Sequence, residues 1–264
     1  MPRVSVVVPV HDEGWAITPF LERIFEAVTL PCELLAVYDL PEDSTVPYLV
    51  EYAQRDARLR PTHNTYGRGP AAALRYGVDH AESDVIVVTM ADGSDDPHQI
   101  DQLTRLVERG VVVAAASRYM RGGQQVGGPW LKGKISHLAG VSLHLLGRVG
   151  THDPTNSFKA YSRDFIREVG IESDTGFSMG IELVAKAKRL GRPVAEIPTI
   201  WLDRAEGTSN FKVSEWLGRY LRWYVHALKP SGKRPKPRPP QPTSASPAQD
   251  LPRGDADAGG GAGG

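Results

Sequence analysis

The sequence predicts an α/β fold with a Rossmann-like, mostly parallel sheet flanked by helices. Three largely apolar runs, residues 4–10, 85–88 and 111–116, have the length and composition of parallel strands that are buried on both faces. Segments with helical periodicity separate these runs, and such alternation implies right-handed crossovers between parallel strands. Polar residues follow directly after the runs, at the edge where open α/β sheets bind ligands.

The first half of the chain alternates between strands and helices. Each helix is expected from apolar residues on one face and from a start signal, as where Asp96 takes the N-cap position and Pro97 the first helical position. Gly110 closes the helix before the fifth strand. The expected strands cover residues 4–10, 34–37, 59–63, 85–89 and 111–116, and the expected helices begin at Thr18, Ser44, Ala71 and Pro97.

The second half of the chain has a less regular pattern and ends in a change of composition. From Pro230 onward Pro, Gly, Ser and Ala dominate, and such a segment buries too little apolar surface to order itself. We therefore expect one domain over residues 1–229 and a disordered tail over residues 230–264. Within the domain we expect helices over residues 129–147, 180–190 and 213–228, and strands over residues 157–161 and 194–198, the latter at a sheet edge because of its prolines.

The overall charge and cysteine content exclude some classes of protein. The 264 residues carry 31 Lys and Arg against 31 Asp and Glu, and this zero net charge argues against a general nucleic-acid binder. The single cysteine, Cys32, excludes an intramolecular disulfide and fits a reducing compartment. No secretory signal and no run of roughly 18 apolar residues for a membrane span is visible. We therefore expect a cytoplasmic protein.

Three carboxylates stand close together after the apolar run 85–88, at Asp92, Asp95 and Asp96. A carboxylate cluster on a tight loop is what a hard cation such as Mg²⁺ or Mn²⁺ needs, and such cations are often shared with the phosphates of a substrate. The alternative is that Asp95 and Asp96 only cap the following helix. Asp92 lies before that helix, so capping does not explain it.

The order of the motifs resembles glycosyltransferase family 2, and within it the polyprenyl-phosphate sugar synthases of the dolichol-phosphate mannosyltransferase type. The resemblance covers about residues 4–228. It implies a GT-A nucleotide-diphosphosugar transferase fold, a divalent metal, and inverting transfer of a hexose from GDP-mannose or UDP-glucose to a polyprenyl phosphate. The similar pieces are residues 6–13, 37–39, 90–92, 117–123 and 153–158, Glu182 in its helix, and residues 203–209.

For the donor, the resemblance implies a nucleotide-sugar pocket at the ends of the first, second and fourth strands. Asp39 matches the acid that contacts the base or the ribose, and Asp92 matches the second acid of the family's Asp-x-Asp metal motif. The residues expected at the nucleotide-sugar are Pro9, His11, Glu13, Asp39, Arg68, Gly69, Ala91 and Asp92, and those expected at the metal are Asp92, Ser94 and Asp95.

The metal motif departs from the family pattern. Its first acid is Met90 here, and a thioether is a poor ligand for a hard cation. Ser94 takes the place of the usual polar residue two positions after the second acid, and Asp95 and Asp96 are additional carboxylates that partly restore the negative charge. Met90 also makes a non-catalytic nucleotide-sugar-binding protein an alternative to an enzyme.

For the acceptor, the resemblance implies cations and a hydroxyl around a lipid phosphate, at Arg118, Lys132, Ser136 and Arg204. A phosphate monoester is already an anion, so it needs cations to aim it and no strong general base. The expected catalytic residues are Asp92, Arg118 and Arg204. The alternatives are that the two arginines form ordinary surface salt bridges, and that a family 2 transferase acts here on a soluble or polysaccharide acceptor.

Three further features each allow two interpretations. Asp153 either orients an arginine or binds the sugar, or it caps a turn before Pro154. Glu182 matches a family position, but it also forms an i,i+4 pair with Lys186 that is typical of a helix surface. The aromatic helix over residues 213–228 either covers the sheet or lies at a membrane interface, where the basic residues of 233–238 would add attraction to anionic lipid. A lipid acceptor favours peripheral contact with the cytoplasmic face of a membrane.

Overall fold

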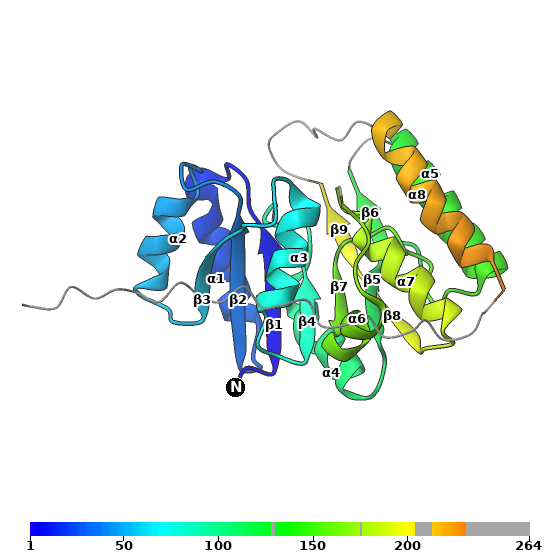
Figure 1. Ribbon diagram of the computed structural model, residues 1–264, viewed down its shortest axis with the longest axis horizontal. Helices are drawn as coiled ribbons and strands as arrows, with labels where there is room; N and C mark the ends of the chain where they lie inside the picture. The colour runs from blue at the N-terminus through cyan, green and yellow to red at the C-terminus, as the bar shows by residue number, and fades with distance from the viewer. Residues whose placement is uncertain (128–129, 175, 204–212, 231–264) are drawn as a thin grey trace, which may run out of the picture.

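In a computed structural model of the chain, the apolar runs form the centre of a seven-stranded sheet (Figure 1). The structure describes residues 1–127, 130–174, 176–203 and 213–230, without the side chains of 130–132, 213–217 and 219. The sheet order is β3-β2-β1-β4-β7-β5-β8, and β6 and β9 form a separate small sheet. The strands are β1 (Val4–Pro9), β2 (Cys32–Tyr38), β3 (Leu59–His63), β4 (Val85–Val88), β5 (Val113–Ser117), β6 (Gln124–Val126), β7 (Lys159–Ser162), β8 (Val194–Pro198) and β9 (Ile200–Leu202).

One antiparallel strand lies inside this otherwise parallel sheet. β3, β2, β1 and β4 are parallel neighbours, and β5 is parallel to β8. β7 is antiparallel to both β4 and β5, so β4 and β5 point the same way. Because β7 runs in the opposite direction, the loop that precedes it lies at the edge where β4 and β5 end. The predicted mostly parallel sheet is confirmed, and β8 is at the sheet edge as its prolines indicate.

Helices cover both faces of the sheet. Alternate residues of β1 face opposite ways: Val6 packs in the core layer of α1, α2 and α4, and Val7 packs in the layer of α3, α6 and α7. The helices are α1 (Ile17–Ala27), α2 (Val46–Ala53), α3 (Pro70–His80), α4 (Ile100–Glu108), α5 (Trp130–Ser142), α6 (Arg163–Val169), α7 (Met179–Arg189) and α8 (Val213–Leu228), with short helical turns η1 (Gly14–Ala16), η2 (Pro97–Gln99) and η3 (Leu143–Gly147).

Most predicted elements are present, with differences at their ends. The Asp96 side chain accepts a hydrogen bond from the His98 backbone N–H at 3.1 Å, which confirms the predicted N-cap. The helix that follows begins as the 3₁₀ turn η2 before continuing as α4. The predicted helix over residues 129–147 ends in a π-helical turn, η3. The sequence analysis missed α6, β6 and β9, which are short.

The last helix packs mainly on other helices in the described part of the chain. α8 contacts α7 and η3, and Figure 1 shows it running beside α5 at the opposite end of the molecule from α2. Trp223 and Ala227 are buried in this contact, whereas Leu221 and Val225 are exposed. Among the described residues, no helix has the length and apolar composition needed to cross a membrane.

Candidate active site

The predicted site residues gather at one edge of the sheet. The parallel strands β1, β2, β4 and β5 all end there, and β7 begins there. This places the loops carrying His11, Asp39, Asp92 and Arg118 along the same edge as Asp153. Pro9, at the end of β1, and Ala91, before Asp92, are buried behind these loops.

The loop after β1 is fixed by hydrogen bonds to the start of α2. The Asp12 backbone N–H donates to Asp43 Oδ2 at 3.0 Å, and the Ser44 N–H donates to Asp12 Oδ1 at 3.2 Å. The Glu13 N–H donates to Thr45 Oγ1 at 3.0 Å. These bonds hold Asp12 in a left-handed conformation, with φ +53°. The loop therefore presents the His11 imidazole, 81% exposed, at the sheet edge, where a flat ring can stack on a base.

Asp39 organises the loop that carries Arg68. Asp39 Oδ2 accepts a hydrogen bond from the Gly69 N–H at 2.6 Å, and Oδ1 accepts from Asn64 Nδ2 at 2.7 Å. Gly69 has φ +100°, a conformation that favours glycine. The exposed Arg68 has no ion-pair partner among the residues that the structure describes. Asp39 thus has a positioning role that the sequence did not indicate, in addition to the nucleotide contact expected of it.

The loop after β4 brings the three expected metal ligands together. Ser94 donates to Asp92 Oδ1 from its hydroxyl at 2.6 Å and from its backbone N–H at 3.1 Å. Asp95 is buried beside them and accepts a hydrogen bond from Thr89 Oγ1 at 2.8 Å. Burial, with a smaller contribution from the negative charge of Asp92, raises the pKa of the Asp95 carboxyl to about 7.

The donor atoms of this loop fit a hard divalent cation. Asp92 is half-buried at the sheet edge and offers carboxylate oxygen, and the Ser94 hydroxyl adjoins it. Mg²⁺ is commonly bound by one or two carboxylates together with water and substrate phosphates, so a complete cage of side chains is not required. This explains how the loop can accommodate Met90 in place of an acid. Asp95 contributes a buried carboxyl behind Asp92.

Arg118 and Asp153 form a buried, two-pronged ion pair. Arg118 Nε donates to Asp153 Oδ2 at 2.7 Å, and Nη2 donates to Oδ1 at 3.0 Å. Their side chains are 12% and 0% exposed, so the alternative of a surface salt bridge is wrong for Arg118. Burial alone would raise the pKa of Asp153, but the Arg118 guanidinium holds it below its usual value. Asp153 also accepts from the Asn156 N–H at 3.1 Å, so it both orients the arginine and caps the turn after Pro154.

Ser136, predicted to contact the acceptor, lies beside this ion pair. Its Oγ is 2.7 Å from Thr155 Oγ1, and Arg118 Nη2 is 3.4 Å from the same Thr155 oxygen. The structure therefore brings Arg118 and Ser136 together through Thr155. Lys132 is in α5, but its side chain lies outside the described part of the chain, as does all of Arg204.

Lys159 is a buried charge that the sequence analysis missed. It lies on β7 level with Val88 of β4 and Ala115 of β5, and its Nζ donates to the Asn156 carbonyl oxygen. Burial lowers the pKa of Lys159 to about 8, although the nearby Asp153 opposes this effect. Its signal in the sequence is a lysine inside the otherwise apolar strand 157–161, directly after a family motif.

Glu182 and Lys186 are also buried, so the interpretation as a surface pair is wrong. Glu182 Oε1 accepts from Lys186 Nζ at 2.6 Å. The two oxygens of Glu182 also accept from the backbone N–H groups of Glu172 and Ser173, at 2.6 and 2.8 Å. The pair therefore holds the segment before α7 against the helix.

Comparison with known proteins identifies relatives of this chain. The chain is 29% identical over 230 residues to a polyprenol monophosphomannose synthase of Mycolicibacterium smegmatis, covering 81% of this chain and 86% of that protein. It is 28% identical over 236 residues to an undecaprenyl-phosphate mannosyltransferase of Micrococcus luteus, covering 85% and 95%.

The fold is also that of solved glycosyltransferases. A mannosyltransferase from Pyrobaculum calidifontis, in complex with GDP-Man and Mn²⁺, superimposes with a TM-score of 0.60 at 20% identity, covering 89% of this chain and 66% of that one. The predicted GT-A fold is thereby confirmed. The model of the family described as "Glycosyl transferase family 2" matches residues 5–170. The chain is a glycosyltransferase and belongs to family 2.

Proposed function

We propose that this chain transfers a hexose from a nucleotide-sugar to a polyprenyl phosphate with inversion at the anomeric carbon. The observation that carries the proposal is the presence of Asp92 and of the Arg118–Asp153 pair along one sheet edge, the first suited to a nucleoside diphosphate and the second to an anionic acceptor. The two bacterial relatives are named as mannosyl transferases or synthases of polyprenol and undecaprenyl phosphate. Their names favour GDP-mannose over UDP-glucose as the donor.

On the donor side, Asp92 and Ser94 would hold a Mg²⁺ or Mn²⁺ ion against the diphosphate. When bound, this ion supplies Lewis-acid stabilisation of the negative charge that develops on the leaving diphosphate. Arg68, exposed on the loop that Asp39 fixes, is placed to meet the nucleotide. His11 offers a ring face to the base.

On the acceptor side, Arg118 binds and aims the phosphate. Asp153 occupies Nε and Nη2 of the guanidinium, which fixes its plane and leaves further N–H donors for an incoming anion. The Ser136 hydroxyl adds a donor next to it. The phosphate oxygen carries the charge for its in-line attack on the anomeric carbon, so no side chain needs to remove a proton.

The exposed apolar residues of α5, η3 and α8 suit an acceptor that carries a polyprenyl chain and lies in a membrane. We infer that this face rests on the cytoplasmic surface of the bilayer that contains the acceptor. Ser136 is flanked on α5 by Ile135 and Leu138, 48% and 72% exposed, so the proposed phosphate site adjoins the apolar face. The exposed apolar residues of this face are Ile135, Leu138, Leu145, Leu146, Leu221, Val225 and Leu228.

Transfer of radiolabelled sugar into an organic-extractable product tests the proposal. The protein is offered GDP-mannose or UDP-glucose with a polyprenyl phosphate and Mg²⁺ or Mn²⁺, with and without EDTA. We expect labelled lipid from one donor, lost with EDTA and in Asp92→Asn, and retained in the surface variant Asp79→Asn. Transfer only to a soluble acceptor, or donor binding without any transfer, would contradict the proposal.

A further inference from the structure

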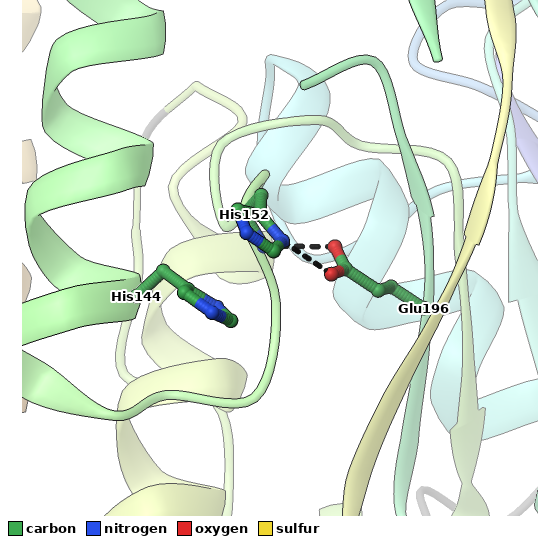
Figure 2. Close-up of side chains that lie close together, drawn as sticks. All are labelled: His144, His152 and Glu196. Atoms are coloured by element: carbon green, nitrogen blue, oxygen red, sulfur yellow. Dashed lines mark hydrogen bonds and ion pairs between the residues drawn. The ribbon is translucent and has the colours of Figure 1, made fainter. Parts of the chain in front are cut away.

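A second group of metal-binding side chains lies away from Asp92. It consists of His144 in η3, His152 in the loop before β7, and Glu196 in β8 (Figure 2). Each residue offers one ligand atom, and these atoms all lie within 4.8 Å of one another. Strands β7 and β5 separate β8 from β4, so this group is distinct from the acidic loop.

Hydrogen bonds already orient two of the three side chains. Glu196 Oε2 accepts from the His152 backbone N–H at 2.8 Å and from Thr151 Oγ1 at 3.0 Å. These bonds direct Glu196 Oε1 to His152 Nδ1, at 2.5 Å. The ring of His144 stacks on that of His152, with 3.6 Å between the centroids and 18° between the planes. The bonds from Thr151 and the His152 backbone to Glu196 Oε2 fix that carboxylate in the way that neighbours orient a metal ligand.

His144 itself points to a missing partner. Its Nδ1 is buried, and it has no hydrogen-bond partner in the part of the chain that the structure describes. A buried polar atom left in this way costs about 1–3 kcal/mol. His144 also belongs to the π-helical turn η3, and π turns occur frequently at functional sites.

We propose that His144, His152 and Glu196 bind one transition-metal ion of the zinc class. Two imidazoles and one carboxylate form a common ligand set for Zn²⁺, whereas the oxygen ligands at Asp92 suit Mg²⁺ or Mn²⁺. Bonds of about 2.0–2.1 Å in tetrahedral geometry need ligand atoms roughly 3.3 Å apart, and each imidazole binds a metal through a lone pair in its own ring plane. The two stacked rings are nearly parallel, so one of them turns out of the stack when the ion binds. The cation replaces the proton between His152 Nδ1 and Glu196, that proton passes to solvent, and water completes the coordination.

Such an ion would join three parts of the molecule. It would tie η3, which continues α5, to the edge strand β8 and to the loop of His152. The next residue, Asp153, holds Arg118. α5 already packs closely on this loop, because a Cβ on Gly140 would overlap the His152 carbonyl oxygen. The metal site would therefore stabilise the acceptor residues at the sheet edge. This consequence rests on the proposed function, and the site itself does not.

Binding of Zn²⁺ alone tests the site without any activity assay. Untagged, chelator-treated full-length protein competes for Zn²⁺ with a chromogenic chelator. We expect the wild type and Asp92→Asn each to bind one Zn²⁺ ion tightly per chain. We expect affinity to fall at least about tenfold in His144→Phe and His152→Phe, which keep a ring at the site but remove its nitrogens. His80→Ala, which removes an exposed histidine on α3, should bind as the wild type does.

Thermal unfolding and the absorption of bound Co²⁺ give two further measurements of the site. Zn²⁺ should raise the Tm of the wild type and of His80→Ala, but not that of His144→Phe. Co²⁺ in place of Zn²⁺ should give the visible absorption of a tetrahedral site in the wild type alone. If the wild type does not bind one Zn²⁺ ion tightly, the proposal is overturned, whether or not the variants fold. Unchanged affinity in His144→Phe, or loss of the site in Asp92→Asn, would overturn it as well.

Discussion

Several charged side chains at the site are buried, and their partners decide what each one does. Arg118 and Asp153 neutralise each other through two hydrogen bonds. Burial raises the pKa of Asp95, whose side-chain hydrogen-bond partner among the described residues is the neutral hydroxyl of Thr89. Since burying a charge is costly unless it is paired, the two cases predict opposite effects of removing a charge.

Asp95→Asn should make the protein more stable at alkaline pH. The folded carboxyl has a pKa of about 7, against 3.8 ordinarily. Between these values the folded state keeps a proton that the unfolded state has released, so the free energy of unfolding falls as pH rises. Asparagine removes this fall. We expect the variant to exceed the wild type at about pH 8 by at most about 4 kcal/mol, and to match it near pH 4.

Urea unfolding without added metal, across this pH range, measures the difference. Asp96→Asn, which keeps the N-cap, is the control. If the free energy of unfolding changed with pH in the same way in Asp95→Asn and in the wild type, Asp95 would ionise normally in the folded protein, against this prediction.

Asp153→Asn should destabilise the fold strongly. It leaves the Arg118 guanidinium buried without its carboxylate, a change that typically costs about 3–5 kcal/mol. The matched control is Glu168→Gln, because Glu168 pairs with Arg192 at 2.8 Å on the surface, where such pairs contribute up to about 1 kcal/mol. Chemical denaturation of both variants measures the contrast. If Asp153→Asn and Glu168→Gln lost the same free energy of unfolding, burial of the Arg118–Asp153 pair would have no energetic consequence.

For single residues, the sequence predicts which side chains belong to the site better than it predicts whether they are buried. Asp96 was predictable as a cap because capping depends on neighbouring residues in the chain. The burial of Lys159 was not predictable, because it depends on β7 entering the sheet between β4 and β5. The burial of Asp95 was not predictable either, because it depends on residues distant in the sequence, such as Phe20 and Ile24 of α1. Asp153 and Arg118 are 35 residues apart in the sequence. The sequence left the role of Asp153 open because a contact over that distance depends on the fold.

Helix α3 approaches the sheet closely at Gly77. A Cβ there would overlap Val7 Cγ1 and lie 3.1 Å from Val37 Cγ2, so Gly77→Ala should lose about 1–3 kcal/mol through overpacking. Among the residues that the structure describes, none lies within 4 Å of such a Cβ on Gly218 in α8, and Gly218→Ala should gain about 0.5–1 kcal/mol from helix propensity. Thermal unfolding of the two variants gives the comparison. Stabilisation by Gly77→Ala would contradict the packing of α3.

The apolar face of α5, η3 and α8 should govern membrane contact. Leu138→Glu with Leu145→Glu removes two exposed leucines, each worth about 1.5–3 kcal/mol when buried in lipid, so binding should weaken by at least about tenfold. Val50→Glu, at an equally apolar exposed position on α2, is the control. Sedimentation with anionic vesicles measures the bound fraction. Equal binding by all three proteins would exclude this face as the contact.

Elements with a strong local signal were predictable, and those defined by pairing were not. The apolar runs predicted β1, β4 and β5, and helical periodicity predicted α8 at its observed bounds. β6 and β9 have three residues each and exist because they pair with one another. Their sequences carry no signal that separates them from loop.

For the whole molecule, the sheet order sets the relation between donor and acceptor. The expected nucleotide-sugar residues lie at the ends of β1, β2 and β4 and in the loop after β3, and the expected acceptor residues Arg118, Lys132 and Ser136 lie after β5 and on α5. Val88, Lys159 and Ala115 lie at one level across β4, β7 and β5, so the two halves meet at a common edge. Alternation of strands and helices predicted that edge, whereas the antiparallel β7 that joins its two halves appears only in the structure.

Steady-state kinetics of Arg118→Lys separates the two proposed roles, of Arg118 at the lipid phosphate and of Asp92 at the donor. Lysine keeps the charge but loses the two-pronged geometry. We expect KM for polyprenyl phosphate to rise at least about tenfold, the worth of one charge-assisted hydrogen bond, while KM for the nucleotide-sugar stays within about twofold. Arg105→Lys, at an exposed arginine on α4 that pairs with Asp101, should change neither. A rise in the nucleotide-sugar KM with an unchanged acceptor KM would show that Arg118 serves the donor and would contradict these assignments.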